Sequence, residues 1–402
     1  MRTNATMCVF VLALALSGAG LLMIYSASAP VAAAQINYVR GRGLERAATF
    51  RPINHDSFFL KRQLVWCGVG FAALLFFYTW DYNKNLKWSG WFWVATVVLL
   101  ALVFVIGAKG GGARRWIRVG PFSLQPSEFA KLALVILTAK VLDDRREQLK
   151  SFARGFLLPL ALAGVTITLI VVEDLGSAAV LGMIMVILWF IAGVRIRHMA
   201  MLVPVAVGFV AVAVAMKPYR LVRITTYLFG ADSQDAGWHA MQSLIAVGTG
   251  GWTGRGLGEG LQKHRYVAAI HTDFIYADVC EELGFVGATV LLLIFAALII
   301  AGFTIAYRTP DFVGAMLAAG ATAMIAVPVV INVAVVLQLL PTKGLPLPFI
   351  SYGGSSLIVN MSAIGLLMNI AQRNEELQEV RRPVDAPFVS RLFGRGKAST
   401  AH

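Results

Sequence analysis

A short acidic segment before a long apolar run has the residue types of a general base. Asp273 stands in the sequence His-Thr-Asp-Phe at 271–274, two residues after His271. A carboxylate in a partly desolvated position has a raised pKa, which suits a group that removes a proton from an alcohol. The alternative is that Asp273 or Thr272 caps the helix that follows. Three further acids are also explained by the stabilisation of negative charge at a helix N-terminus: Asp278, Glu281 and Glu282.

Basic residues before the fourth apolar run have the chemistry of a diphosphate site. Arg114 and Arg115 follow three glycines at 110–112 and a single alanine, and Arg118 comes shortly afterwards. Guanidinium groups bind phosphate oxygens in a forked geometry. The alternative is that these arginines contact lipid head groups at the membrane surface.

A charged pair lies inside the same apolar run. Glu128 and Lys131 are three residues apart in Gln-Pro-Ser-Glu-Phe-Ala-Lys at 125–131, so they share a helix face and can form an ion pair. Charges inside a membrane span are costly and are typically functional. The alternative is a structural pair at the start of a helix, with Ser127 as its cap.

Two further segments could contribute to a binding site: a turn that contains an acid and a run rich in glycine. Asp174 lies in the turn between two apolar runs, where it either belongs to the site or caps the next helix. Gln242 and Ser243 precede a glycine-rich run at 248–258 that contains Arg255. The backbone of such a run can approach a ligand closely, and a flexible turn is the alternative.

The segment Pro-Thr-Lys-Gly-Leu-Pro-Leu-Pro-Phe-Ile-Ser-Tyr-Gly-Gly-Ser-Ser at 341–356 combines prolines with paired glycines. It predicts a rigid, non-helical re-entry at the membrane surface, which is tolerated only against protein or water. Prolines that merely shape a loop are the alternative. The candidate substrate-binding residues of this segment are Lys343, Ser351, Gly353 and Gly354.

The elements that must position these residues are membrane spans. Of the 402 residues, 58% are hydrophobic and 14% are charged, with a mean hydropathy of +0.72. Soluble domains are about a quarter charged, so this composition excludes a soluble enzyme and a disordered chain. Ten apolar runs have about the length that a membrane span needs: 7–26, 63–80, 88–107, 126–142, 155–172, 175–194, 199–216, 283–307, 312–340 and 355–372.

An even number of spans places both termini on one side and the segments with the unusual residues on the other. We therefore predict an all-α, polytopic integral membrane protein with one domain over 1–372, a large loop at 217–282 and a charged tail at 373–402. The net charge of +14 suits an anionic lipid surface or an anionic substrate. The basic residues are spread over many loops, which argues against nucleic-acid binding. The three cysteines, Cys8, Cys67 and Cys280, form no disulfide or metal pattern.

In their order and spacing, these segments resemble the SEDS family (shape, elongation, division and sporulation), the polytopic peptidoglycan glycosyltransferases that include FtsW and RodA. The resemblance extends from Tyr25-Ser26-Ala27-Ser28 to Asn369. It includes Gln-Pro-Ser-Glu at 125–128, Asp-Leu-Gly-Ser-Ala at 174–178, His-Thr-Asp-Phe at 271–274, Glu-Glu-Leu-Gly at 281–284 and the whole of 341–356. Pro-Thr-Lys-Gly at 341–344 is closer to the FtsW branch than to RodA.

The resemblance implies the polymerisation of lipid II, an undecaprenyl-diphosphate-linked disaccharide pentapeptide, for cell division or cell shape. It implies a bacterial cytoplasmic membrane protein with cytoplasmic termini and an extracytoplasmic active site. The family's candidate catalytic aspartate falls on Asp273, and its charged pair falls on Glu128 and Lys131. The implied partners are membrane lipids, the glycan on its lipid carrier and a class B penicillin-binding protein that crosslinks the new strand. A divalent cation, Mg²⁺ or Mn²⁺, is the one cofactor the family suggests.

The chain also departs from the family pattern. Ala268-Ala269 stands where Pro-Glu is common, Glu173 replaces a proline, His239 replaces a glutamine, and a basic insert occupies about 31–58. Other functions compatible with the same composition are a lipid II flippase, a secondary transporter and a division scaffold without catalysis. The transporter is disfavoured because the sequence has no internal repeat and its unusual charges lie near one surface.

Overall fold

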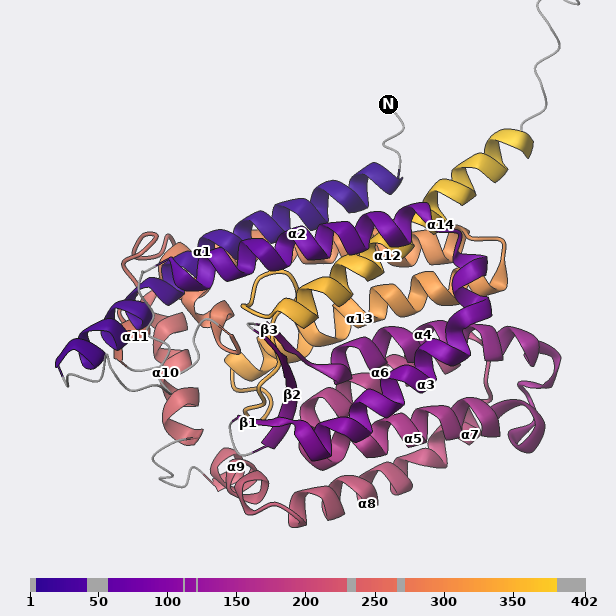
Figure 1. The fold of residues 1–402 in the computed structure, drawn as a ribbon, viewed down its shortest axis with the longest axis horizontal. Helices are drawn as coiled ribbons and strands as arrows, with labels where there is room; N and C mark the ends of the chain where they lie inside the picture. Colours follow the sequence, from indigo (N-terminus) through magenta and orange to yellow (C-terminus); the bar gives the residue numbers. More distant parts are fainter. Residues whose placement is uncertain are drawn as a thin grey trace, which may run out of the picture.

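The computed structural model describes residues 5–41, 57–110, 113–120, 122–229, 236–265 and 272–381, and it is a bundle of helices with one small sheet (Figure 1). The long helices run roughly alongside one another; the small sheet and several short helices lie towards one end of the bundle, and another short helix, at 196–200, lies towards the other. The helices are α1 Ala5–Gly41, α2 Phe58–Thr79, α3 Tyr82–Ile106, α4 Pro126–Asp144, α5 Leu157–Glu173, α6 Leu175–Ile191, α7 Ile196–Ala200, α8 Leu202–Ala215, α9 Pro218–Phe229, α10 Ala236–Thr249, α11 Gln262–Arg265, α12 Ile275–Arg308, α13 Phe312–Val336 and α14 Gly354–Arg381.

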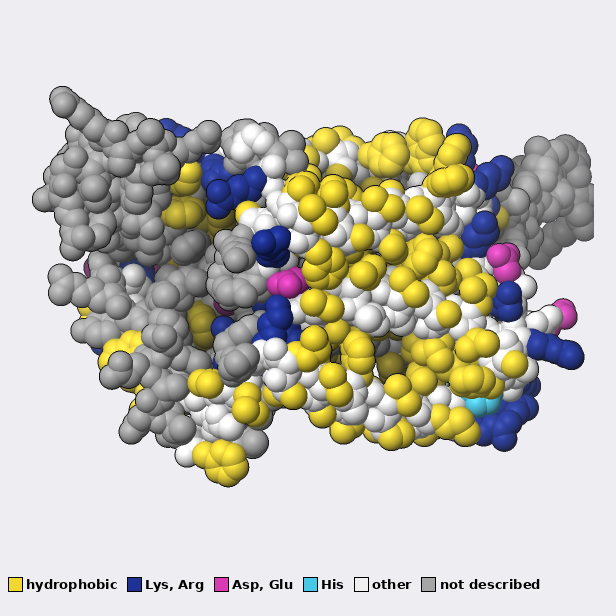
Figure 2. All heavy atoms as spheres, turned by 60° about the horizontal axis from the view of Figure 1, so that its bottom comes forward, with side chains coloured by type: hydrophobic (Ala, Val, Ile, Leu, Met, Phe, Trp, Pro, Cys, Tyr) yellow, Lys and Arg dark blue, Asp and Glu magenta, His cyan; other side chains and the backbone are white. Residues whose placement is uncertain are grey.

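Each of the ten predicted spans falls on a helix, which confirms the polytopic helical architecture. Within the described ranges, eight helical segments are long and apolar enough to cross a membrane. The other two predicted spans are α6, which is apolar but has 17 residues, and α4, which carries charges and has 19. Figure 2 shows a broad belt of hydrophobic side chains on one face, with basic side chains gathered towards its ends. This belt has the pattern of a surface in contact with lipid.

The core of the bundle is built from α4, α13 and α14. Most of α4 is buried, and 78% and 83% of the apolar windows of α13 and α14 are buried. Small residues allow this close packing because the backbones of neighbouring helices can approach each other. A Cβ added to Gly320 of α13, for example, would lie 2.4 Å from Cγ1 of Val135 in α4.

The start of α1 and the C-terminal part of α14 lie at the same end of the bundle, as the even number of spans predicts. The backbone N–H of Ala5, at the start of α1, donates to Glu375 Oε1 in the last part of α14 at 3.0 Å. The segments with the unusual residues gather at the opposite end (Figure 1).

A three-stranded antiparallel sheet at that end was not predicted. It consists of β1 Ala108–Gly110, β2 Ala113–Val119 and β3 Phe122–Leu124, in the order β1-β2-β3. Lys109 pairs with Arg114, and Ile117 pairs with Leu124. The sheet joins α3 to α4 and presents Arg114 and Arg115 from its central strand.

Several helix boundaries differ from the sequence-based expectation. Helix α1 continues to Gly41 although its predicted span ends at 26, and α14 continues to Arg381, into the predicted tail, although its predicted span ends at 372. Helix α12 begins at Ile275 rather than at 283, and its dihedral angles are non-helical at Gly284 (φ 66°, ψ −169°), where the helix kinks. Helix α13 ends at Val336, and the segment 341–353 is non-helical, as its prolines predict.

The predicted helix caps are partly wrong. The N-cap of α4 is Gln125, with Pro126 at the first helical position, and not Ser127. The N-cap of α12 is Phe274, and no side chain caps it, so neither Thr272 nor Asp273 has that role. Asp174 does cap α6, because its carboxylate accepts from the backbone N–H of Ser177 at 3.1 Å.

Candidate active site

Asp273 lies in the short segment that leads into α12, beside the non-helical segment 341–353. Its side chain is half-buried. A Cβ added to Gly344 would lie 2.7 Å from Asp273 Oδ2, so the carboxylate rests directly against the backbone of Gly344. A side chain at position 344 would therefore displace the carboxylate.

Two buried polar side chains hold these segments together. The amide of Asn332, in α13, donates to the backbone carbonyls of Asp273 at 2.9 Å and Leu345 at 2.7 Å. The hydroxyl of Ser351 donates to the carbonyl of Thr272 and accepts from the N–H of Leu347 at 2.8 Å. Because each side chain bridges both segments, the position of Asp273 relative to 344–347 is fixed.

A cavity of about 230 Å³ opens beside Gly344 and is predominantly cationic. Four basic side chains and one carboxylate line it, which gives it a strongly positive potential. Its remaining walls are apolar residues of α6 and α8 and the backbone of the non-helical segment. The lining residues are Arg115, Asp174, Leu175, Gly176, Val210, Val214, Arg220, Arg223, Pro341, Thr342, Lys343 and Gly344.

Arg115 and Asp174 form the wall of the cavity that the sheet and α6 provide. Nη1 of Arg115 lies 3.7 Å from Asp174 Oδ2, and its Nε donates to the carbonyl of Glu173 at 3.2 Å. Asp174 also accepts from the hydroxyl of Ser177 at 2.9 Å. The carboxylate therefore both caps α6 and orients Arg115, so the two roles expected for it are compatible.

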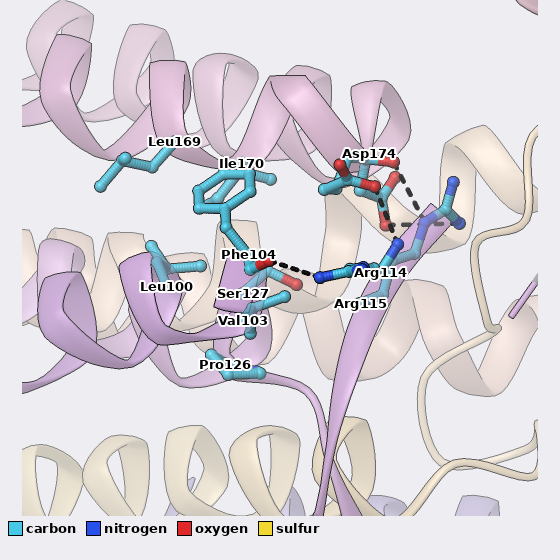
Figure 3. A pocket seen from close by; sticks show the side chains of 11 residues that line it. Leu100, Val103, Phe104, Arg114, Arg115, Pro126, Ser127, Leu169, Ile170 and Asp174 are labelled. Atoms are coloured by element: carbon cyan, nitrogen blue, oxygen red, sulfur yellow. Dashed lines mark hydrogen bonds and ion pairs between the residues drawn. The ribbon is translucent and has the colours of Figure 1, made fainter. Parts of the chain in front are cut away.

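Arg114 does not line this cavity, and its guanidinium group instead binds the C-terminus of α3. Its Nη1 donates to the carbonyls of Phe104 at 2.7 Å and Val105 at 3.3 Å, at the C-terminus of α3 (Figure 3). A guanidinium group there satisfies carbonyls that the helix leaves unpaired. Its backbone N–H donates to Glu173 Oε2 at 2.8 Å. Arg114 lines a small pocket of about 20 Å³ between α3 and α5, whose wall it shares with Arg115 and Asp174.

Arg220 and Arg223, on the amphipathic helix α9, were not among the predicted site residues. Arg220 is buried and donates to the carbonyls of Ala213 at 2.8 Å and Val171 at 2.9 Å, which ties α9 to the ends of α8 and α5. Arg223 is half-buried and lines the cavity one turn further on. The spacing of the two arginines in Pro-Tyr-Arg-Leu-Val-Arg at 218–223 was the sequence signal, because residues three apart share a helix face.

The electrostatics of the site favour a base that is ionised near neutral pH. Burial raises the pKa of Asp273 to about 6, Arg115 and Arg223 lower it, and Asp174 raises it. Burial also lowers the pKa of Lys343, and Asp174 partly opposes that shift. At pH 7 a carboxyl group with a pKa of about 6 is roughly 90% ionised, and it is a better base than an ordinary aspartate.

Several predicted site residues lie outside the cavity wall. Glu128 and Lys131 form a buried ion pair at 2.8 Å within α4. Gln242 and Ser243 are buried on α10, where the Ser243 hydroxyl donates to the carbonyl of Val336 at 3.2 Å. Arg255 lies in the glycine-rich run, with Nε 4.0 Å from Glu281 Oε1.

The remaining predicted residues are two glycines and a histidine. A Cβ on Gly354 would lie 2.2 Å from the Trp66 ring, so only glycine fits where α14 begins. Gly353 has more room, with Ser356 Cβ 3.8 Å from the position of an added Cβ. His271 lies outside the described residues.

The described residues do not fit a divalent cation. No group of three or more His, Cys, Asp or Glu in the described ranges is arranged to hold a metal ion. The cavity has a single carboxylate among four cations, and such a lining repels a cation.

Comparison with known families gives one assignment over almost the whole chain. The family described as "Cell cycle protein", that of FtsW, RodA and SpoVE, matches residues 6–376. Stage V sporulation protein E of Bacillus subtilis (strain 168) is 39% identical over 377 residues, 92% of this chain and 98% of that protein. A probable peptidoglycan glycosyltransferase FtsW from Geobacter sp. (strain M18) is 38% identical over 372 residues, 91% of this chain and 96% of the relative.

Solved structures agree with the family match. A structure described as "Structural coordination of polymerization and crosslinking by a peptidoglycan synthase complex" aligns with a TM-score of 0.72 at 27% identity, over 91% of this chain and 97% of that one. The rod shape determining protein RodA of Thermus thermophilus aligns with a TM-score of 0.64 at 27% identity, over 91% of this chain and 96% of that chain.

Proposed function

The chain belongs to the FtsW, RodA and SpoVE family of cell cycle proteins, and we propose that it is a peptidoglycan glycosyltransferase that polymerises lipid II into glycan strands. The observation that carries the proposal is the position of Asp273, a half-buried carboxylate held against Gly344, a residue that lines a cavity with four basic side chains. This arrangement pairs a base with a binding site for an anion, which is what a transfer from a lipid diphosphate requires.

The chemistry assigns one role to the carboxylate and another to the cations. Asp273 removes the proton from the 4-hydroxyl group of the acceptor lipid II. That oxygen forms a bond to the anomeric carbon of the growing strand, with inversion, and the bond from this carbon to the diphosphate breaks. The proton leaves Asp273 for water, and undecaprenyl diphosphate is released.

As the bond breaks, the leaving diphosphate gains one negative charge on the oxygen that was bonded to the anomeric carbon, and this charge needs compensation. Arg115, Arg223 and Lys343 line the cavity and are the residues assigned to that task. Preorganised cations at such a position typically contribute several kcal/mol to stabilisation of the transition state. Arg114, whose position in the sequence also suggested this role, and Arg255 of the glycine-rich run lie outside the cavity lining, which favours Arg115, Arg223 and Lys343.

A reconstitution with purified protein tests the enzyme against its alternatives. The protein, with a class B penicillin-binding protein as its proposed partner, is given labelled lipid II in detergent, and glycan polymers are resolved on a gel. Ladders that disappear in Asp273→Ala, while the variant keeps the wild-type melting temperature, are the expected result. Unchanged ladders from Asp273→Ala would remove Asp273 from the mechanism. Movement of lipid II across vesicles without any polymer would identify a flippase instead.

The membrane orientation is part of the same proposal. We place both termini in the cytoplasm and the cavity on the outer face, so that the polymer forms where the cell wall lies. A fluorescent protein fused after Arg381 should fluoresce in the cytoplasm, whereas alkaline phosphatase at the same position should be inactive. Active phosphatase at that position would reverse the orientation.

A further inference from the structure

Asn332 is an amide near the C-terminal end of the buried helix α13, four residues before Val336, and its hydrogen bonds leave that helix. Its side chain is 2% exposed. Both N–H groups of the amide are used, one on the carbonyl of Asp273 and one on the carbonyl of Leu345. Its carbonyl oxygen Oδ1 has no hydrogen-bond partner among the described residues. Burying an amide costs free energy unless its polar atoms form hydrogen bonds. We therefore attribute the presence of Asn332 to the two hydrogen bonds that it donates.

The two acceptors lie in different non-helical segments, and both are next to the proposed reaction centre. One is the backbone of Asp273 itself, and the other is one residue after Gly344, against which the Asp273 carboxylate rests. A bridge between these two carbonyls fixes the distance between the two segments at this point. Once the backbone of Asp273 is fixed, only its two side-chain torsions remain to place the carboxylate.

Asn369 makes the same kind of bridge at the opposite end of the bundle. Its amide donates to the carbonyls of Tyr78 at 2.6 Å and Trp80 at 3.3 Å, where α2 passes into α3. The chemistry of the two bridges is alike, but the Asn369 bridge lies at the end that carries the termini. It therefore provides a control for the general effect of losing a bridging amide.

We propose that Asn332 is a positioning residue that holds Asp273 in its catalytic place by bridging the backbone of Asp273 to that of Leu345. The inference rests on the proposed function, since it assumes that Asp273 is the base. Asn332 acts through Asp273 and does not touch the substrate. Losing the bridge lets the carboxylate move away from Gly344 towards water, and a misplacement of about 1 Å can reduce the rate by up to about 100-fold.

The bridge also sets the environment in which Asp273 titrates. The charged groups that act on Asp273 are Arg115 on β2, Asp174 just before α6 and Arg223 on α9. Lys343 lies next to Gly344 in the non-helical segment and lines the same cavity as these three residues. Burial is the main cause of its raised pKa. A carboxylate that has swung towards water loses part of that burial, so its pKa should fall towards the ordinary value.

The variants Asn332→Leu and Asn369→Leu test the proposal, because leucine has a similar shape to asparagine without its donors. Polymerisation of labelled lipid II is measured as a function of pH, together with the thermal midpoint of each variant. For Asn332→Leu we expect kcat to fall about 10- to 100-fold, with KM changed less than threefold and the acid midpoint of the pH profile shifted below about 6. For Asn369→Leu we expect a lower thermal midpoint with kcat per folded molecule and the acid midpoint unchanged.

A second variant keeps the proposal testable should Asn332→Leu not fold. Asn332→Gln retains both donors on a side chain one methylene longer, and should show a smaller fall in kcat with the same direction of shift in the acid midpoint. Wild-type kcat and midpoint in either folded Asn332 variant would overturn the proposal, as would the same kcat loss in Asn369→Leu. Full activity of Asp273→Asn, measured alongside, would instead overturn the role of Asp273 and hence the proposed function.

Discussion

Two groups of carboxylates lie within one short stretch of this chain, and their surroundings differ. Asp273 lies against Gly344 at the edge of a cationic cavity. The inner acidic cluster, which we define as Asp278, Glu281 and Glu282, lies on the first turns of α12 and is at most 1% exposed. In the sequence, Asp273 and the inner acidic cluster are alike, since both are acids before an apolar run. In the structure, Asp273 is half-buried beside the cavity, whereas the cluster is closed off from solvent.

The inner acidic cluster is enclosed by the chain itself. Glu281 accepts from the N–H groups of Leu261 at 2.9 Å and Gln262 at 3.2 Å. Glu282 pairs with Lys263 and accepts from the Ser26 hydroxyl at 2.7 Å. A carboxylate whose oxygens bind its own backbone and side chains fastens a loop to a helix, whereas one beside an open cavity can take part in a reaction.

The largest expected difference is between Asp273→Asn and Asp278→Asn. Removing a general base typically lowers a rate about 10²- to 10⁴-fold, and we expect a loss of that size for Asp273→Asn. Asp278→Asn replaces one of three crowded, buried acids without touching the cavity, so polymerisation should stay within about twofold and the protein should not be less stable. Initial rates of polymerisation of labelled lipid II check both variants. An equal loss of rate in the two would contradict the claim that Asp273 takes part in the reaction and the inner acidic cluster does not.

Breaking the pair of Lys263 with Glu282 should affect stability rather than chemistry. Lys263→Met leaves a buried carboxylate without its counter-ion, which typically costs about 3–5 kcal/mol. The exposed pair of Arg373 with Asp81, at 3.4 Å, supplies the control. Arg373→Gln should cost less than about 1 kcal/mol. Unfolding followed by tryptophan fluorescence in detergent measures both, and similar costs would show that burial is not what strengthens the inner pair.

The glycines that face the two groups give a further contrast. Gly344→Ala places a Cβ 2.7 Å from Asp273 Oδ2, too close unless the carboxylate moves. We expect at least about a tenfold loss of kcat with little change in the thermal midpoint. Gly260→Ala places a Cβ 3.1–3.2 Å from one oxygen of each acid in the inner acidic cluster, and should leave the rate per folded molecule unchanged. Wild-type kcat in Gly344→Ala would contradict the placement of the carboxylate.

The smallest expected effect is a shift in pH dependence. With a pKa of about 6 for Asp273, polymerisation should be half-maximal near pH 6 and fall tenfold per unit below it. Arg115→Gln removes the main cation that lowers this pKa, so its midpoint should move to higher pH, whereas Asp278→Asn should leave it in place. A pH–rate profile in which Arg115→Gln moves the midpoint downwards would show that another group titrates.

The same raised pKa has the opposite consequence for folding. Between about pH 4 and 6 the folded protein holds the Asp273 proton more tightly than the unfolded chain does. Stability therefore falls as the pH rises through this window, and the protein should be most active where Asp273 contributes least to its stability.

The spans could be predicted from sequence because length and apolarity alone decide which segments enter a bilayer. The start of α12 could not, because Asp278, Glu281 and Glu282 have the composition of a loop. Glu281 and Glu282 can lie on a buried helix because partners distant in sequence bind them: the backbone N–H of Leu261 binds Glu281, and Lys263 and Ser26 bind Glu282. The sheet was missed for a related reason, since its strands are short and glycines interrupt any alternation.

Residue types were enough to predict some members of the candidate site. Residues whose role depends on where the folded chain directs their side chains could not be predicted in this way. Asp273, Arg115, Asp174 and Lys343 come together as the sequence suggests. Arg114 has the same chemistry as its neighbour, but successive residues of a strand point to opposite faces, and its guanidinium group binds the end of α3 instead. Asn332 had a signal in the sequence, as an amide within an apolar run, but its partners are known only once the chain is folded.

The position of α8 determines which measure of substrate concentration should control the rate. This helix packs chiefly against α7 and α9, and it presents Val210 and Val214 to the cavity while its other valines face outwards. A ligand with a long hydrocarbon chain can therefore reach the cations sideways from the bilayer without crossing bulk water. Saturation should then follow the mole fraction of substrate in the membrane, so that diluting vesicles in buffer leaves the rate unchanged while diluting the substrate with inert lipid lowers it.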